Sequence, residues 1–422
     1  MDALYHDGIG FRRMTRAPTE FRYWDRLERP AHRWMRRASR ALGGFDLAPP
    51  DDVVRAFADM YYDADPLAEA FVRDVYLTRG MAAGRAMLED ALANGAGPDA
   101  PPSLRALFAD IDEDPPWLDR DRLERGARVF RRWGTSVFRF AGAVTLAAYS
   151  ESSVAKPLAL TGAYAGASTK HRFLETAAFW IAVSEPGGMR PGGAGRASAL
   201  RVRMMHVFVR DRLLAHPDWD LEAWGVPISQ ADALLTLMGG SVAPGIALRA
   251  MGYRPSRADI EATMHFWRYV GHVMGVRPRW YPASVEEALQ LAFVTHVKSA
   301  RTAGEDGVRL CQSWVDAFAA GEDASLRSRL SDGVHRGFTR AFLPPAAYAA
   351  NRLPPAGPWA LLPFACFPFI FGAETLRRAL PPLEHVADRA ARWRRRRWLA
   401  HHTGGRPPEY APRDPTATRA RA

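Results

Sequence analysis

Residues 201–210 read RVRMMHVFVR, and the arginines of the segment Val202 to Leu214 recur at helical spacing. This spacing predicts a helix despite the valine and phenylalanine content, because residues three and four apart share one helix face. Ala- and Leu-rich stretches with the same period recur along the chain, for example Phe71 to Ala93 and Leu123 to Tyr149. Alternating runs typical of strands are scarce. The sequence therefore predicts an all-α protein.

The chain divides into three predicted parts. Residues 1–50 form an N-terminal extension that is rich in arginine and aromatic residues. Asp51 and Asp52 are expected to cap a helix that starts directly after them. Residues 51–340 predict one large helical domain, and residues 341–422 a Pro-rich appendage that is first apolar and then Arg-rich.

Composition excludes several classes of protein. With 422 residues, 48% of them hydrophobic and 24% charged, the chain is neither disordered nor too short to bury a large core. The two cysteines, Cys311 and Cys366, lie far apart. Neither a disulfide framework nor a structural zinc site is therefore predicted.

The net charge of +11 is concentrated near the C-terminus. Residues 374–422 contain twelve arginines against five acidic residues, more than half of the total excess. Because no recognition module accompanies these arginines, nucleic-acid binding is not predicted. Two alternatives remain for residues 359–398: a peripheral membrane contact, or a terminal helix that packs on the body. The second is favoured.

The sequence predicts a cytoplasmic protein with a possible membrane association. No secretory signal is visible at the N-terminus. No run of 18 apolar residues exists, so a membrane-spanning helix is not expected. The nearest approach, Trp359 to Ala373, contains Pro363 and Pro368, which interrupt a helix.

Familiar catalytic motifs are missing. The sequence has no GxSxG, no HExxH, no P-loop and no dinucleotide-binding GxGxxG opening a strand–helix unit. A di-iron bundle needs Glu-x-x-His on two helices. Glu261 and His265 are instead four apart and no second copy follows, which argues against a di-iron centre.

His206 is the first candidate for chemistry. Its neighbours Met204, Met205, Val207 and Phe208 are apolar, and desolvation favours a neutral imidazole, the form that binds a metal. The spacing alone leaves open an ordinary core histidine.

Two arginines share the helix face of His206. Arg203 lies three residues before it and Arg210 four residues after it. Guanidinium groups pair well with carboxylates, so these arginines suit the propionates of a haem.

Arg172 and Thr176 form the second candidate, because their i,i+4 spacing places them on one helix face. A hydroxyl and a guanidinium beside an apolar cavity suit the binding of dioxygen or haem. The alternative is an ordinary helix with Arg172 and Glu175 at its surface. His265 and His272, seven apart, are interpreted as core residues, with a supporting role toward a ligand as the alternative.

The order of these motifs resembles the MpaB / latex-clearing-protein (rubber oxygenase catalytic domain) oxygenase family. The matching blocks cover roughly residues 110–300. They are Pro115-Pro-Trp117-Leu-Asp119, Leu123-x-x-Gly126, Arg172-x-x-x-Thr176, Arg203-x-x-His206-x-x-x-Arg210, Pro227-Ile-Ser-Gln230 and Trp267-Arg-Tyr-Val-Gly-His272-x-x-Gly275.

The resemblance implies a helical fold with a globin-like core and extra helices, and a b-type haem (heme b) with its iron. It implies His206 as the metal ligand and places Arg172 and Thr176 in the haem pocket. The implied activity is a haem-dependent oxidoreductase that uses dioxygen to cleave C=C bonds of an unsaturated, hydrophobic isoprenoid or lipid-like substrate.

The chain departs from the latex-clearing branch in three ways. Glu175 occupies the position of that branch's distal lysine, so lysine ligation is not expected. Glu151, Lys156 and Glu175 all stay open as the distal base. That branch is secreted and this chain shows no export signal, so rubber itself is not the expected substrate. The alternative functions are a non-catalytic haem-binding sensor or carrier and a membrane-associated helical protein.

Overall fold

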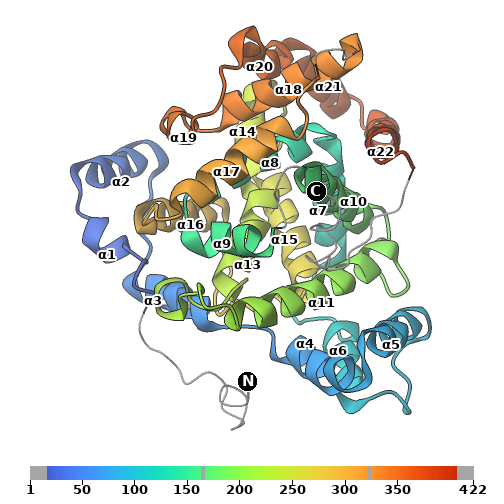
Figure 1. Cartoon of the computed structure of the whole chain (residues 1–422). Helices are drawn as coiled ribbons and strands as arrows, with labels where there is room; N and C mark the ends of the chain where they lie inside the picture. The colour runs from blue at the N-terminus through green and yellow to red at the C-terminus, as the bar shows by residue number, and fades with distance from the viewer. Residues whose placement is uncertain (1–16, 163–166, 322–324, 406–422) are drawn as a thin grey trace.

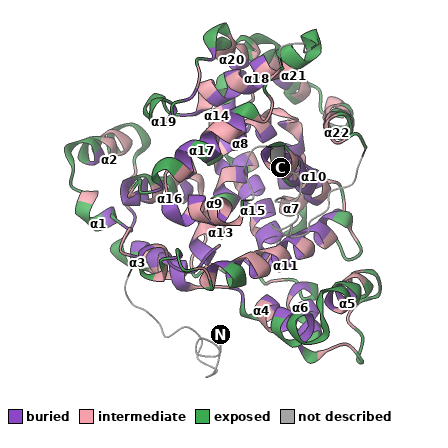
Figure 2. Ribbon diagram, in the orientation of Figure 1, coloured by how far each residue is buried: buried purple, intermediate pink, exposed green. Residues whose placement is uncertain are grey.

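The computed structural model describes residues 17–162, 167–321 and 325–405, and over these ranges it contains helices and no strand (Figure 1). The prediction of one large all-α domain is confirmed. The helices bury their apolar faces against one another, and Figure 2 shows the buried residues gathered at the centre of the molecule. The globin-like character of the core stays a prediction.

The first helices along the chain are α1 (Tyr23–Arg26), α2 (Pro30–Gly43), α3 (Asp51–Asp59), η2 (Met60–Tyr62), α4 (Pro66–Phe71), η3 (Val72–Leu77), α5 (Met81–Asn94), α6 (Pro102–Asp112), α7 (Arg120–Arg132) and α8 (Ser136–Ala148). The middle of the chain forms α9 (Ser152–Thr161), α10 (Ala167–Ser184), α11 (Ala194–Leu214), α12 (Leu221–Trp224), α13 (Gln230–Gly240), α14 (Val242–Ala247), η4 (Leu248–Met251) and α15 (Arg257–Val273). The last helices are α16 (Val285–Lys298), α17 (Gly304–Asp316), α18 (Leu326–Phe342), α19 (Pro345–Ala350), η5 (Gly357–Leu361), α20 (Leu362–Ala365), α21 (Phe367–Ala379) and α22 (Pro382–Thr403).

Helix α15 runs through the core and is the most deeply buried of the long helices that position the site. It begins with a capping box in which Ser256 and Asp259 satisfy each other's backbone N–H groups. It packs closely on α7 at Gly126, where an added Cβ would lie 2.0 Å from the carbonyl oxygen of Ala262. The contact therefore requires glycine at this position.

Three predicted helices differ in detail from the observed ones. The stretch predicted from Leu123 to Tyr149 is two helices, α7 and α8, because Gly134 adopts a positive φ of 59° between them. The stretch predicted from Phe71 to Ala93 contains the π-helix η3 before α5 begins. The expected cap by Asp51 and Asp52 is wrong: both lie inside the first turn of α3, whose N-cap is Pro50. In the first turn the two carboxylates interact favourably with the positive end of the helix dipole and so stabilise the helix.

The C-terminal part packs against the body at several points. Helix α18 continues past residue 340, where the boundary of the domain was expected. Trp359 packs on this helix at Gly337, where an added Cβ would lie 2.2 Å from the Trp359 carbonyl oxygen. Helix α22 lies against α10, because Arg395 is fully buried and donates to the Ser184 hydroxyl at 2.8 Å. The favoured alternative, a terminal helix packed on the body, agrees with these contacts. The basic tail from residue 406 lies outside the described residues, as do residues 1–16 of the predicted extension.

Two stretches among the described residues are long and apolar enough to cross a membrane by length and composition. One, Gln230–Met251, is 56% buried inside the protein and belongs to the core. The other, Gly357–Ala379, is only 11% buried. Pro363 and Pro368 interrupt it as expected, and each stands in the first turn of a new helix, α20 or α21. The expectation that no helix spans a membrane stays a prediction.

The buried imidazole of His335 predicts a pH dependence of stability. His335 is 4% exposed and its Nε2 lies 2.9 Å from the Trp314 carbonyl oxygen. Burial lowers its pKa to about 4, so the unfolded chain takes up a proton at a higher pH than the folded protein does. The stabilisation is complete above about pH 6.5 and declines as the pH falls toward 4.

The unfolding free energy of the wild type should fall between pH 7.5 and pH 5. We expect this fall to be about 2 kcal/mol smaller in His335→Gln, because the variant lacks the buried imidazole. Urea denaturation at the two pH values measures this difference. His216→Gln, at a partly exposed position, is the control. Equal pH dependence in the wild type and His335→Gln would contradict the prediction.

Candidate functional site

Helices α10 and α11 lie against each other and are joined by a glycine-rich loop, residues 185–193. The close approach at the start of α11 requires Gly195, since an added Cβ would lie 2.5 Å from the Cα of Val183. One turn before the middle of α10, Arg172 points across the interface and its NH1 lies 3.7 Å from the sulfur of Met205. The two predicted candidate segments are therefore brought together.

His206 lies in the middle of α11. Burial, together with the positive charges of Arg210 and Arg172, lowers its pKa to about 4, and the opposing charge of Asp65 does not restore it. The imidazole is therefore neutral at physiological pH, as its apolar neighbours predict. Neither ring nitrogen forms a hydrogen bond with any residue that the structure describes. A neutral, unpartnered imidazole has the chemistry of a metal ligand.

Arg203 is committed to the protein's own carboxylates. Only 1% exposed, it forms a bidentate pair with Asp65, with N–O distances of 2.7 and 2.8 Å. Asp110 lies 3.6 Å from its NH1. The end of α15 also presses on this pair, because an added Cβ at Gly275 would lie 2.1 Å from Asp65. A haem propionate would have to displace Asp65 to bind Arg203, so these contacts do not favour the predicted role, which no observation tests directly.

Arg210 is similarly engaged. Its NH1 donates to Glu69 at 2.9 Å, and its Nε and NH2 donate to the carbonyl oxygens of Pro227 and Ile228 at 3.0 and 2.8 Å. The motif Pro227-Ile-Ser-Gln230 therefore has a structural role, because its first two carbonyl oxygens accept hydrogen bonds from Arg210. Gln230, in turn, donates to the carbonyl oxygen of Gly275 at 3.0 Å. Arg210 thus fixes a loop against α11.

On α10, Arg172 and Thr176 share one face as predicted. Arg172 is 23% exposed and its NH1 lies 3.3 Å from Glu175, which also lies 3.3 Å from His171. The Thr176 hydroxyl donates to the carbonyl oxygen of Arg172 at 3.0 Å, and its side chain is accessible. Arg172 is thus the least enclosed of the three predicted arginines.

Thr176 opens onto an apolar pocket between α8, α10 and α17. The pocket has a cavity volume of about 70 Å³, room for roughly two water-sized molecules. Aromatic and aliphatic side chains form most of its wall, among them Phe138, Phe173, Trp180 and Trp314. Among the described residues of the wall, hydroxyl groups come from Thr145, Tyr149 and Thr176. The pocket therefore suits a small apolar guest.

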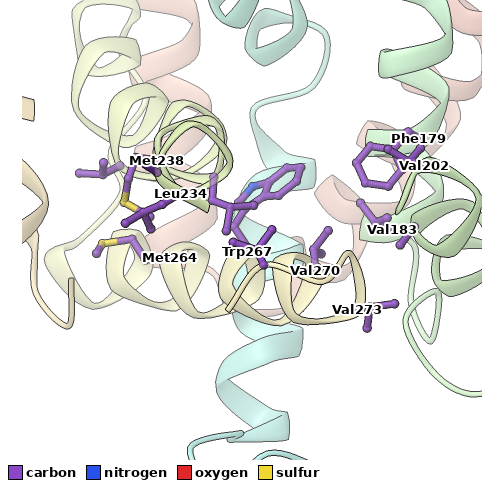
Figure 3. Close-up of a cluster of buried hydrophobic side chains, with 14 of the residues drawn as sticks. Phe179, Val183, Val202, Leu234, Met238, Met264, Trp267, Val270 and Val273 are labelled. Atoms are coloured by element: carbon purple, nitrogen blue, oxygen red, sulfur yellow. The ribbon is translucent and has the colours of Figure 1, made fainter. Parts of the chain in front are cut away.

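An apolar cluster supports the back of the two helices. It joins α10 and α11 to α13 and α15 (Figure 3). Its labelled members are Phe179, Val183, Val202, Leu234, Met238, Met264, Trp267, Val270 and Val273. Val202 lies four residues before His206, and Val183 lies seven residues after Thr176, so each shares a helix face with a residue of the candidate site. Because this cluster is closely packed, it fixes the rotation of α10 and α11.

The three candidates for the distal base differ in their surroundings. Glu151 is paired with Lys298 at 3.1 Å and with the Ser299 hydroxyl, and Lys156 is paired with Asp306 at 2.7 Å. Only Glu175 contacts a residue of the candidate site, namely Arg172. The choice among them stays open, with this contact in favour of Glu175.

His265 and His272 lie in the core on α15. Trp117 makes edge-on ring contacts with both, and His265 pairs with the backbone of Asp119 at 3.1 Å. The Nε2 atom of His272 is buried without a hydrogen-bond partner. Across the described ranges, three or more His, Cys, Asp or Glu side chains nowhere form a group that could hold a metal ion.

Sequence analysis missed the acidic partners of α11. Asp65, the N-cap residue of α4, binds Arg203, and Glu69 within α4 binds Arg210; both lie more than a hundred residues earlier in the chain. Their own i,i+4 spacing was a signal, because two carboxylates on one helix face match two guanidinium groups on another. It also missed Lys298, a buried ammonium whose pKa is raised by Tyr61 and Glu151 against the effect of burial.

The structure thus defines a helical domain with a neutral histidine on α11 and an apolar pocket beside Thr176 on the neighbouring α10. Residues 127–368 match the family model described as "ER-bound oxygenase mpaB/B'/Rubber oxygenase, catalytic domain", and the chain belongs to this family. The resemblance inferred from the motifs is thereby confirmed.

Two known proteins illustrate the relationship. The rubber oxygenase of Streptomyces sp. (strain K30) is 30% identical over 193 residues, which are 44% of this chain and 46% of that protein. The matched region thus spans less than half of that relative. The structure of the latex clearing protein LCP in the closed state aligns with a TM-score of 0.60 at 23% identity, covering 80% of this chain and 91% of that chain. This second likeness shows that the fold is shared.

Removal of Asp65 tests the buried pair. We expect Asp65→Ala to cost about 3–5 kcal/mol of unfolding free energy, because the Arg203 guanidinium stays buried without its partner. Chemical denaturation measures this cost. Asp218→Ala, at a side chain that is 71% exposed, is the control and should change stability by less than about 0.5 kcal/mol. A loss as small as that of the control would contradict the prediction.

Proposed function

We propose that the protein is a haem b-dependent oxygenase that uses dioxygen to oxidise an unsaturated, hydrophobic substrate of the isoprenoid or lipid-like class. The proposed outcome is oxidative cleavage of a C=C bond. The observation that carries the proposal is His206, a neutral imidazole without a hydrogen-bond partner among the described residues, in the middle of a helix that faces Arg172. Membership of an oxygenase family supports it.

The residues present fit a haem through their donor chemistry. His206 offers a neutral nitrogen that would bind the haem iron. Arg172, partly exposed and held only by Glu175 and Met205, has a guanidinium that could pair with a propionate. Arg203 and Arg210, which are held by Asp65 and Glu69, would support the ligand-bearing helix.

When bound, the haem would supply the activation of dioxygen, and the protein would supply position and environment. Thr176 presents its hydroxyl beside the apolar pocket. Its O–H donates to the Arg172 carbonyl oxygen in this structure, and rotation of the hydroxyl would redirect this hydrogen bond to an oxygen atom in the pocket. The cavity of about 70 Å³ has room for a molecule the size of dioxygen. Phe173, Trp180 and Trp314 make this space apolar, and their rings would limit the access of water to it.

The substrate class follows from the same surroundings. A pocket walled by aromatic and aliphatic groups favours an apolar guest over a charged one. The related protein is a rubber oxygenase, and an unsaturated isoprenoid or lipid-like chain has the matching apolar chemistry. A cavity of about 70 Å³ would admit only a small part of such a chain. Glu175 contacts Arg172 and is therefore our candidate for the group that moves a proton at the site.

Loss of the proposed ligand should abolish haem uptake. We expect His206→Ala to be purified without the absorption band of a bound haem and to remain without it after titration with hemin. The control is His216→Ala, which alters a histidine just beyond the end of α11. Retention of haem by His206→Ala at the wild-type level would refute the assignment. A wild-type protein that takes up no hemin would refute the haem proposal as a whole.

Loss of the hydroxyl should affect turnover and spare the cofactor. We expect Thr176→Ala to bind haem with the wild-type spectrum and to consume dioxygen with an isoprenoid alkene roughly tenfold or more slowly. Oxygen-electrode measurements provide the rate. Thr145→Ala, which alters another hydroxyl on the pocket wall, is the matched control. Unchanged turnover in Thr176→Ala would remove this residue from the catalytic site.

A further inference from the structure

A second pocket lies between α7, α15, α21 and α22, away from the residues of the proposed haem site. It has a cavity volume of about 340 Å³. Its wall is dominated by guanidinium groups from Arg125, Arg128, Arg132, Arg377 and Arg378. An arginine-lined cavity of this kind is suited to an anion with several oxygen atoms.

The carboxylates around the pocket do not balance these arginines. Asp259 accepts from Arg125 at 2.9 Å. Glu374 lies 3.2 Å from Arg377, which also pairs with Glu384. These three carboxylates face five guanidinium groups, so the cavity carries an excess of positive charge.

Two of the arginines are free of acidic partners. Over the described residues, neither Arg128 nor Arg378 forms an ion pair, and Arg378 donates only to the carbonyl oxygen of Arg254, at 2.6 Å. Because no carboxylate neutralises them, both are available to an incoming anion.

Arg132 points to a ligand independently of the charge count. Its side chain is 9% exposed, yet the buried Nε and NH2 atoms have no hydrogen-bond acceptor. Glu374 and Asp259 lie 3.3 and 3.6 Å from these atoms, and Glu384 lies 3.8 Å from NH1, so Arg132 is ion-paired although Nε and NH2 form no hydrogen bond. A buried donor without an acceptor is costly, and phosphate oxygens in the pocket would supply the missing acceptors.

The pocket borders an apolar surface on α20 and α21. This surface exposes Phe369 to 79% and Leu376 to 53%, and Figure 2 shows both helices largely exposed at one end of the molecule. A chain of contacts connects it to the pocket. Arg378 donates to Arg254, whose guanidinium lies 4.6 Å from the ring centroid of the exposed Phe371.

One side of helix α21 packs closely on the part of the body that contains Gly252 and Arg254. An added Cβ at Gly252 would lie 2.5 Å from the carbonyl oxygen of Phe367. The 6%-exposed Glu374 accepts from the backbone N–H of Arg254 at 3.3 Å. The segment therefore presents one apolar face outward, as a helix that lies in a membrane interface does.

We propose that this end of the protein docks on an anionic lipid membrane, with the phosphate of a lipid headgroup bound in the arginine pocket. The aromatic and aliphatic side chains of α20 and α21 enter the interfacial region of the bilayer, and Arg128, Arg132 and Arg378 bind the phosphate oxygens. A free phosphate ion would use the same arginines. The adjoining apolar face favours the lipid, because a lipid bilayer would bury this face and a soluble anion would leave it exposed to water.

Vesicle flotation of the full-length protein tests the proposal without requiring haem or turnover. We expect binding to vesicles of phosphatidylcholine with phosphatidic acid, and much weaker binding to phosphatidylcholine alone. Arg128→Gln/Arg378→Gln should weaken binding to the anionic vesicles by about 30-fold, the loss of two arginine contacts with an anionic surface. The control, Arg79→Gln/Arg85→Gln, removes the same charge from exposed positions around α5, at the opposite end of the molecule in Figure 1, and should bind as the wild type does.

A second variant distinguishes the two sources of phosphate. Phe369→Ser/Leu376→Ser should lose vesicle binding, while calorimetry should show inorganic phosphate binding it as it binds the wild type. Phosphate binding to the wild type without flotation would overturn the lipid assignment. Equal flotation of the wild type and Arg128→Gln/Arg378→Gln would overturn the role of the pocket. Because the altered side chains have no carboxylate partner or are exposed, denaturation midpoints should stay at the wild-type value and exclude misfolding as the cause.

Discussion

The buried ion pair between Arg203 and Asp65 is the interaction on which the centre of the structure depends. It joins α11 to the N-terminus of α4, where the Asp65 side chain also accepts from the backbone N–H of Ala68 at 3.3 Å. Gly275, just beyond α15, closes over both partners. Three segments distant in sequence thus meet at one charge pair. Its bidentate geometry sets the rotation of α11, and with it the direction in which His206 points.

His206 is neutral even though a carboxylate is near. Burial is the main reason that its pKa is lowered, and the positive charge of Arg210 acts in the same direction. Asp65 opposes this shift, and Arg172 on α10 adds to it. Burial and the surrounding guanidinium groups therefore keep the histidine available to a metal. The structural and the chemical demands on α11 are met by the same side chains.

The sequence predicted the all-helical fold and the neutral histidine, since the first follows from local periodicity and the second from apolar neighbours. Only the family resemblance placed Arg172 in the same pocket as His206. The sequence did not predict what Arg203 and Arg210 bind, because their partners lie on α4 and helical spacing carries no information about distant elements. Gly134 likewise divided a continuous periodic stretch into two helices, because a positive φ is a backbone requirement that the pattern of apolar residues does not reveal.

The arginine-rich C-terminus shows why total charge is a poor guide to partners. Arg392 and Arg396 pair with Glu185, and Arg395 is buried against Ser184 between the rings of Phe130 and Phe138. These residues join α22 to the body, so the charge run largely serves the protein itself. The uncompensated charge lies instead in the pocket beside α21, where guanidinium groups outnumber carboxylates. Arg395 shows that an unsatisfied donor is not a binding site by itself, because its Nε and NH1 atoms also lack acceptors while its guanidinium lies against two aromatic rings. Unsatisfied donors indicate an anion site where they line a cavity, as those of Arg132 do.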